Sequence, residues 1–355
     1  MRYEEFALVS YTPAFYRTGI PNTIDHHLLD MGLKNDGAIY MDNISDLLRK
    51  SNDGGIGRRI KSLGLHYRGD TEDHEYLNGV NDLALGIIES LREHSLFAGL
   101  FMLGDTGLNA NWLQRFEVKR VGESLNQVTM YSDFDGYRSH YLEFYCTDRA
   151  EIVTPEDDKP ALVIRAAKGQ SIGTNTRLSI YLNRFGKLHR DGDRPALVLN
   201  DREGYRNFII CARDGELHRS ADEPALYGTT SDFTMSVHAC DGHIHNEDGP
   251  AIDYNAKRVE AYTSYIVNGK PRSSTPTAAL VCLTTNVLTH YYLDDNFEVH
   301  NEYGPAIKSI NAGKTVTRVY ARHGHKMSGK EEWLMRSKMT EAEKGLYVLG
   351  EDLDA

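Results

Sequence analysis

The chain has 355 residues, of which 40% are hydrophobic and 26% charged, and its formal net charge is −11. This composition is typical of a soluble globular protein, and the length allows two domains or one domain with an array. The acidic balance makes nucleic acid an improbable main partner and an anionic membrane an improbable surface, because both are bound by basic patches.

Targeting and redox signals predict an intracellular protein. No apolar run approaches the roughly 20 residues that cross a bilayer, and the first residues, Met-Arg-Tyr-Glu-Glu, lack the pattern of a secretion signal. The four cysteines show no close pairing, which predicts reduced thiols in a cytosolic setting: Cys146, Cys211, Cys240 and Cys282.

Residues 1–125 show no internal repeat and predict an α/β-type domain. Apolar residues recur at helical spacing from 72 to 93, with Thr71 placed to cap that helix. Shorter helices are expected at 44–50 and 56–63, and strands at 5–11, 95–103 and 116–121.

Two motifs in this domain are candidates for catalytic or cofactor sites. The glycine-rich stretch at 53–57 lacks the Lys-Ser/Thr of a phosphate loop and predicts an ordinary loop. Tyr67-Arg68-Gly69 resembles the first motif of arginine-type ADP-ribosyltransferases, in which the arginine holds the dinucleotide phosphates. The Ser-Thr-Ser strand and Glu-x-Glu turn of those enzymes are not found. We therefore predict no catalytic residue and no cofactor, and keep an N-terminal enzyme targeted by the rest of the chain as an alternative.

From residue 126 onward a short sequence motif recurs. Gly-Lys-Leu-His-Arg at 186–190 leads to Pro-Ala-Leu, and related phrases follow at 215–219, 242–246 and 297–301. Aligned on the histidine, the steps are 154 to 189 (35, with an insertion), 189 to 218 (29), 218 to 245 (27), 245 to 272 (27), 272 to 300 (28) and 300 to 327 (27). Degenerate copies place Thr154, Arg272 and Met327 at the histidine position. A fixed pitch of this kind indicates a repeat architecture.

Each unit follows one plan. A short apolar run after Pro-Ala leads through a polar turn to a longer run rich in β-branched and aromatic residues. An Asp-Gly or Asn-Gly pair then supplies the positive φ angles of a tight turn before the histidine. We interpret each unit as a β-hairpin followed by a short returning strand that carries the histidine, with Pro-Ala starting the next unit.

The recurrent residues are assigned structural roles. A histidine ring nitrogen is expected to bind the backbone of the following turn. Metal binding by the histidines is rejected, because equivalent residues two strands apart lie about 10 Å apart, too far to share an ion bound at about 2 Å. The structural set is His189, His218, His245, His300, Pro195, Pro224, Pro250 and Pro305.

The Gly-Lys-Leu-His-Arg and Asp-Gly-Pro-Ala phrases resemble MORN-like repeats found in proteins of large bacteriophages and other large DNA viruses. The resemblance covers about residues 145–327 and is specific in the four histidine copies. It implies a β-hairpin array, a viral origin and a location in the host-cell cytoplasm. It implies no enzymatic activity.

After the last unit, residues 328–355 predict helices that cap the array. Ser328 to Glu331 and Thr340 to Glu343 each fit a capping box, and an array needs its ends covered. The predicted fold class is therefore α+β, with an N-terminal α/β-type domain (1–125), an antiparallel β-hairpin array (126–327) and a C-terminal helical cap (328–355).

The predicted function is binding of a viral or host protein, or of a second copy of the chain, inside the infected cell. Tyrosine is favoured at interfaces, and the candidate surface consists of Tyr181, Tyr205, Tyr262, Tyr265, Tyr291, Tyr292 and Tyr320. The alternative for these tyrosines is packing between neighbouring strands. The alternative for the chain is a structural or decoration component of the virion.

Overall fold

The computed structural model describes residues 115–134, 137–147, 152–165, 177–200, 207–220, 223–229, 233–256, 260–272, 278–284, 287–311 and 314–353. The N-terminal domain expected over 1–125 lies almost wholly outside these residues. So do Arg68, the helix expected over 72–93, and Tyr205.

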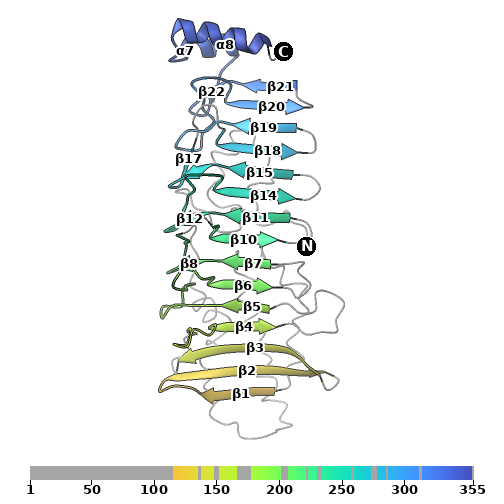
Figure 1. Cartoon of the computed structure of the whole chain (residues 1–355), viewed down its shortest axis with the longest axis vertical. Helices are drawn as coiled ribbons and strands as arrows, with labels where there is room; N and C mark the ends of the chain where they lie inside the picture. The colour runs from red at the N-terminus through yellow and green to blue at the C-terminus, as the bar shows by residue number, and fades with distance from the viewer. Residues whose placement is uncertain are drawn as a thin grey trace.

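Fifteen strands form one antiparallel sheet in which neighbours along the chain are neighbours in space. Figure 1 shows them stacked along the long axis of the molecule. At a spacing of about 4.8 Å the stack extends roughly 70 Å. The strands are β1 (Arg115–Arg120), β2 (Leu125–Phe134), β3 (Tyr137–Thr147), β4 (Leu162–Arg165), β5 (Arg177–Ile180), β6 (Leu197–Asn200), β7 (Asn207–Ile210), β10 (Leu226–Thr229), β11 (Phe233–Val237), β14 (Ile252–Ala256), β15 (Glu260–Ser264), β18 (Leu280–Thr284), β19 (Val287–Tyr291), β20 (Ile307–Asn311) and β21 (Lys314–Val319).

Small two-stranded hairpins lie along one side of this sheet (Figure 1). They are β8 (Ala212–Arg213) with β9 (Glu216–Leu217), β12 (Ala239–Cys240) with β13 (His243–Ile244), β16 (Ile266–Val267) with β17 (Lys270–Pro271), and β22 (Ala321–Arg322) with β23 (His325–Lys326). Single bridges join Cys146 to Ile152, Leu182 to Leu188 and Leu293 to Val299 at the corresponding places of other units. A unit thus contains two hairpins, one in the large sheet and one beside it.

The tight turns of the small hairpins have the geometry that their sequences predict. Asp214 and Gly215 have φ angles of 53° and 86°, and Asp241 and Gly242 have 48° and 76°. Two consecutive positive φ angles define the turn that matches strand twist and favours Asp-Gly. His323 and Gly324 adopt the same conformation, with φ angles of 45° and 73°, although the pair is not Asp-Gly.

One continuous hydrophobic core lies between the large sheet and the small hairpins. Along β6, Leu197 and Leu199 are buried in this core while Val198 faces the other way, as the two-residue period of a strand requires. The alanine of each Pro-Ala step is almost completely buried, and its backbone extends the ladder between strands: Ala161, Ala196, Ala225, Ala251 and Ala306. In the degenerate copy Ala279, which follows Ala278 in place of proline, takes the same position. The Pro-Ala motif therefore places a small side chain where the chain enters the core.

The sheet begins earlier than the expected boundary at residue 126. β1 pairs with β2 along its whole length, from Arg115 opposite Tyr131 to Arg120 opposite Asn126. The strand predicted at 116–121, which the sequence places in the N-terminal domain, is therefore the first strand of the array sheet. β2 and β3 also pair with each other, from Leu125 opposite Thr147 to Phe134 opposite Tyr137.

Two helices, α7 (Lys330–Arg336) and α8 (Glu341–Leu353), follow the last hairpin, as the sequence predicts. The capping box at α8 is present, because Thr340 and Glu343 exchange hydrogen bonds. At α7 the backbone and hydroxyl of Ser328 donate to Glu332 rather than to Glu331, which corrects the expected pair. No helix in the described part of the chain is long and apolar enough to span a bilayer.

Candidate functional site

The recurrent histidines join one unit to the next. The ring Nδ1 of His189 accepts a hydrogen bond from the backbone N–H of Asp214 at 3.1 Å. His218 accepts from Asp241 and His245 from Asn268, both at 3.1 Å, and His300 accepts from His323 at 3.2 Å. The ring-to-backbone contact expected from the sequence is therefore present at all four positions. We call each such contact a unit junction.

Backbone bonds on both sides of the histidine reinforce each junction. At the first, Gly215 donates to the carbonyl of Leu188 at 2.9 Å, and Arg190 donates to the carbonyl of Ala212 at 3.2 Å. The pattern repeats at the other three junctions. Because Nδ1 must accept from the turn, each ring nitrogen Nε2 carries the proton when the histidine is neutral.

The residue after the histidine fixes the loop that leads to Pro-Ala. The guanidinium of Arg190 donates to the carbonyl of Pro195 at 3.2 Å, five residues on, and Arg219 donates likewise to Pro224 at 3.1 Å. Where the loop is one residue shorter, an asparagine takes this role: Asn246 donates to Pro250 at 2.9 Å and Asn301 to Pro305 at 3.1 Å. Sequence reasoning missed this bond, although the match between Arg or Asn and loop length is visible in the sequence.

The degenerate copies change the junction in three ways. Thr154 replaces the ring nitrogen with its hydroxyl oxygen, which accepts from the backbone N–H of Leu182 at 2.7 Å. Arg272 reaches back and donates to the carbonyl of Glu247. Met327 is buried, with only 8% of its surface exposed, and packs in a separate cluster with Tyr320 and Trp333.

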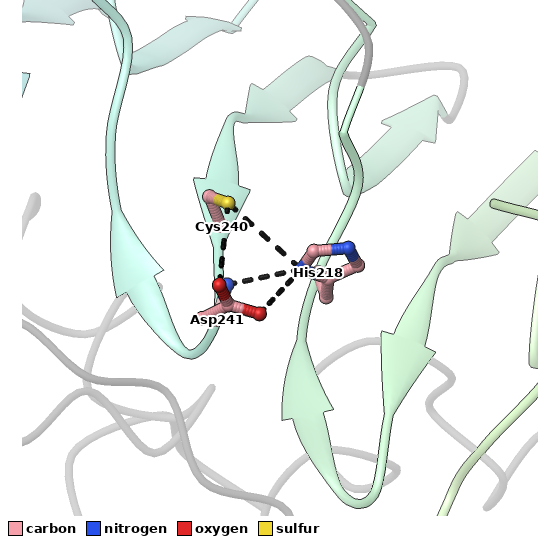
Figure 2. Close-up of side chains that lie close together, drawn as sticks. All are labelled: His218, Cys240 and Asp241. Atoms are coloured by element: carbon pink, nitrogen blue, oxygen red, sulfur yellow. Dashed lines mark hydrogen bonds and ion pairs between the residues drawn. The ribbon is translucent and has the colours of Figure 1, made fainter.

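At the second junction three potential metal ligands converge (Figure 2). The Sγ of Cys240 lies 3.9 Å from the Nδ1 of His218 and 3.8 Å from the Oδ2 of Asp241. The Oδ1 of Asp241 lies 3.0 Å from the same Nδ1. Cys240 and Asp241 are adjacent in β12 and its turn, so the small hairpin presents both to the histidine of the preceding unit.

Charged neighbours surround this cluster. The Nη2 of Arg213 lies 2.7 Å from both the Nδ1 of His218 and the Oδ1 of Asp241. On the other side of the ring, the Oδ1 of Asp193 lies 3.8 Å from the Nε2 of His218. Hydrogen bonds from Ser220 lower the pKa of Asp193, and burial, aided by the charge of Asp241, raises the pKa of the Cys240 thiol.

A second cluster lies at the last junction. The Nδ1 of His323 is 2.7 Å from the Oδ2 of Asp294, and the rings of His300 and His323 stack with centroids 4.1 Å apart. Burial, and then the charge of His323, lowers the pKa of His300. A salt bridge from Lys338 lowers the pKa of nearby Glu302.

The spacing argument against metal binding addressed only equivalent histidines. The first cluster instead pairs His218 with Cys240 and Asp241 at the next turn. The second pairs His300 with His323 of the next turn and with Asp294, which precedes His300 in the chain. The relevant sequence signal is a cysteine or carboxylate at the Asp-Gly turn one unit after a histidine.

The tyrosines of the predicted interaction surface occupy different environments. Tyr291 is 5% exposed and belongs to the main core, while Tyr181 and Tyr320 are 8% and 6% exposed. The Arg190 guanidinium covers Tyr181, 3.8 Å from its ring centre. Tyr265 and Tyr292 are half-buried, and the backbone of Tyr262 pairs with Tyr254. The five tyrosines of this set whose side chains the structure describes therefore do not share one open face, and the role of the set in binding stays a prediction.

Comparison with known proteins found no matching family model and no matching curated protein.

Proposed function

We propose that the chain is a non-enzymatic viral scaffold, of bacteriophage type, that binds another protein through its repeat array inside the infected cell. An N-terminal α/β-type domain over residues 1–125 is part of this proposal. The viral assignment is supported by the resemblance of the repeated phrases, and the binding role by the outward face of the large sheet.

The observation that carries the binding role is a cross-strand row on that face. Successive pairing partners run continuously along it: Asn200, Asn207, Thr229, Thr234, Asn255, Ala261, Leu283, Leu288 and Ile310. The row is polar over β6–β14 and becomes apolar over β18–β20. Since the core residues Leu280 and Cys282 face the small hairpins, Leu283 faces away from them.

Leu283 is the centre of the apolar part, which we call the β18–β20 patch: Val281, Leu283, Leu288 and Ile310. Leu283 is 45% exposed, and the other three are half-buried. The adjacent row continues from Val281 through His290 to Lys308 and Arg318, so two basic residues border the patch. Burial and the charge of Lys308 lower the pKa of His290, which favours its neutral form. An apolar patch with a charged rim is typical of a protein interaction site.

The chemistry of the patch selects an acidic partner segment with apolar side chains. Apolar burial would supply most of the affinity, and the basic row would orient the partner and make binding depend on salt.

The test compares full-length variants by affinity purification from infected cells with mass spectrometry. Leu283→Ser is expected to lose the partner that the parent protein captures, because it removes the centre of the patch. Asn255→Ser, on the polar part of the same row, is the matched control and is expected to retain it. Retention of the same partner by Leu283→Ser would contradict the proposal. Recovery of the chain in purified particles at fixed stoichiometry would instead identify a virion component.

A further inference from the structure

We propose that His218, Cys240 and Asp241 form a zinc-binding site that clips two consecutive units of the array together. The proposal is independent of the protein-binding role, since it rests on the geometry of the second junction.

The first argument is the fit of the ligand atoms. Zinc binds thiolate sulfur at about 2.3 Å and imidazole nitrogen or carboxylate oxygen at about 2.0–2.2 Å, so ligand atoms around a tetrahedral ion lie roughly 3.3–3.6 Å apart. The Sγ of Cys240 lies 3.9 Å from the Nδ1 of His218 and 3.8 Å from the Oδ2 of Asp241, while the other carboxylate oxygen, Oδ1, lies 3.0 Å from Nδ1. One ligand atom from each residue lies within 4.8 Å of the other two. Rotation of the Asp241 carboxylate, with a small approach of the Cys240 side chain, would bring one atom from each residue into the coordination sphere of one ion. Water would complete the coordination.

The chemistry of the donor set selects the metal. One thiolate, one imidazole and one carboxylate form a mixed set that suits zinc better than magnesium or calcium, which prefer oxygen ligands alone. Binding would replace the thiol proton of Cys240 with a zinc–sulfur bond and release that proton to the solvent.

The surroundings of His218 prepare the ring for this role. The junction directs the Nδ1 lone pair toward Cys240 and Asp241 (Figure 2) and leaves the proton on Nε2. Nε2 also contacts the Nη2 of Arg213, so Asp193, whose Oδ1 lies 3.8 Å from Nε2, would receive this N–H once Arg213 has turned away. A carboxylate behind a zinc-bound histidine orients the ring and increases its basicity. On binding zinc, Nδ1 would exchange its hydrogen bond from Asp241 for the metal.

In this structure Arg213 forms a salt bridge with the carboxylate of Asp241. Its guanidinium contacts both His218 and Asp241 and brings a positive charge to the place that an ion would occupy. The Arg213 side chain is 51% exposed, so it can turn toward solvent when zinc binds. Arg213 is therefore expected to compete with the metal.

Neighbouring junctions provide matched comparisons within the chain. At the next junction His245 accepts the same backbone bond, but Val267 and Asn268 stand where Cys240 and Asp241 stand at the second. At the last junction the rings of His300 and His323 are stacked. Their in-plane lone pairs run side by side instead of converging, so this cluster is the poorer site.

The experiment titrates zinc into the full-length reduced protein by calorimetry and uses Co²⁺ as a spectroscopic probe. We expect one zinc per chain and a sulfur-to-cobalt charge-transfer band. That band would report Cys240, because the other three cysteines of the chain are buried. Cys240→Ser should abolish the band and weaken zinc binding by more than the roughly 10–100-fold that loss of a supporting residue costs.

Two further variants test the competing role of Arg213 and the neighbouring junction. Arg213→Gln should bind zinc more tightly, and His245→Gln should bind it as the parent does, although it breaks an equivalent junction. Zinc should raise the melting temperature of the parent protein and not that of Cys240→Ser. Unchanged affinity in Cys240→Ser, or loss of binding in His323→Ala, would overturn the proposal.

Discussion

The position that carries the histidine is filled differently inside the array and at its end. Inside, a histidine binds the turn of the following unit through a polar contact. At the end no further unit follows, and Met327 stands at the histidine position beneath Trp333. A histidine fits this position where the next unit supplies the backbone donor, whereas Arg272 finds its partner in the preceding unit.

The cap also makes one polar contact. The indole Nε1 of the fully buried Trp333 donates to the backbone carbonyl of Asn301 at 3.0 Å. Tyr320 and Tyr347 flank the indole, with ring centres 5.4 and 5.2 Å away. A single side chain thus covers the apolar end and satisfies a backbone group of the last unit, as a terminal cap of a repeat array must.

Removing Trp333 should have the largest effect on stability. Trp333→Ala would leave a cavity and an unpaired Asn301 carbonyl, at a cost of about 3–5 kcal/mol. Denaturant unfolding with hydrogen exchange should show the loss concentrated in β20–β23.

Met335→Ala on the same helix is the control, since Met335 is 77% exposed. It should change stability by less than about 0.5 kcal/mol. Equal losses in the two variants would mean that α7 does not cap the array.

Installing histidine at the end should destabilise the protein, although histidine is the more frequent residue at this position of the repeat. Met327→His would bury a polar ring with no following turn to donate to it, which costs about 1–3 kcal/mol. Thermal unfolding would measure this cost. A gain in stability would show that the histidine acts by packing alone.

Removing an inner histidine should cost less, because water can reach the exposed turn. His245→Ala takes away the acceptor of the Asn268 N–H, and we expect a loss of about 1 kcal/mol. Hydrogen exchange provides the direct readout: the Asn268 amide should exchange faster, while the Asp241 amide, held by His218, should keep its rate. No change at Asn268 would mean that the ring contact adds nothing.

Repetition explains how much of this fold could be predicted. Strands, turns and junction histidines recur, so each assignment is supported by several copies, and the capping box at Thr340 is a local signal. The role of Arg190 and Asn246 matches a loop length that the sequence shows, but the carbonyl that each side chain reaches appears only in the contacts. The cluster at His218 depends on which side chains of the next turn face back, and the indole of Trp333 reaches a carbonyl 32 residues away. Such contacts are set by stacking between units.

The smallest expected effect is on the pH dependence of stability, and it concerns the last junction of the array. Burial and the charge of His323 lower the pKa of His300 in the folded protein, so the unfolded chain, with an ordinary histidine pKa of about 6.5, takes up the proton first. The stabilising contribution is therefore complete above about pH 6.5 and declines as pH falls toward the lowered value. Glu302 also stabilises the protein less as pH falls, but at more acid pH. Lys338 lowers the pKa of Glu302 in the folded protein, so the stabilising contribution of this carboxylate is lost only below the ordinary carboxylate range. His300→Gln should flatten the loss of stability between pH 7 and 5, whereas His325→Gln, at an exposed position in β23, should not. If both variants follow the parent curve, the stacked pair at the last junction does not couple stability to protonation.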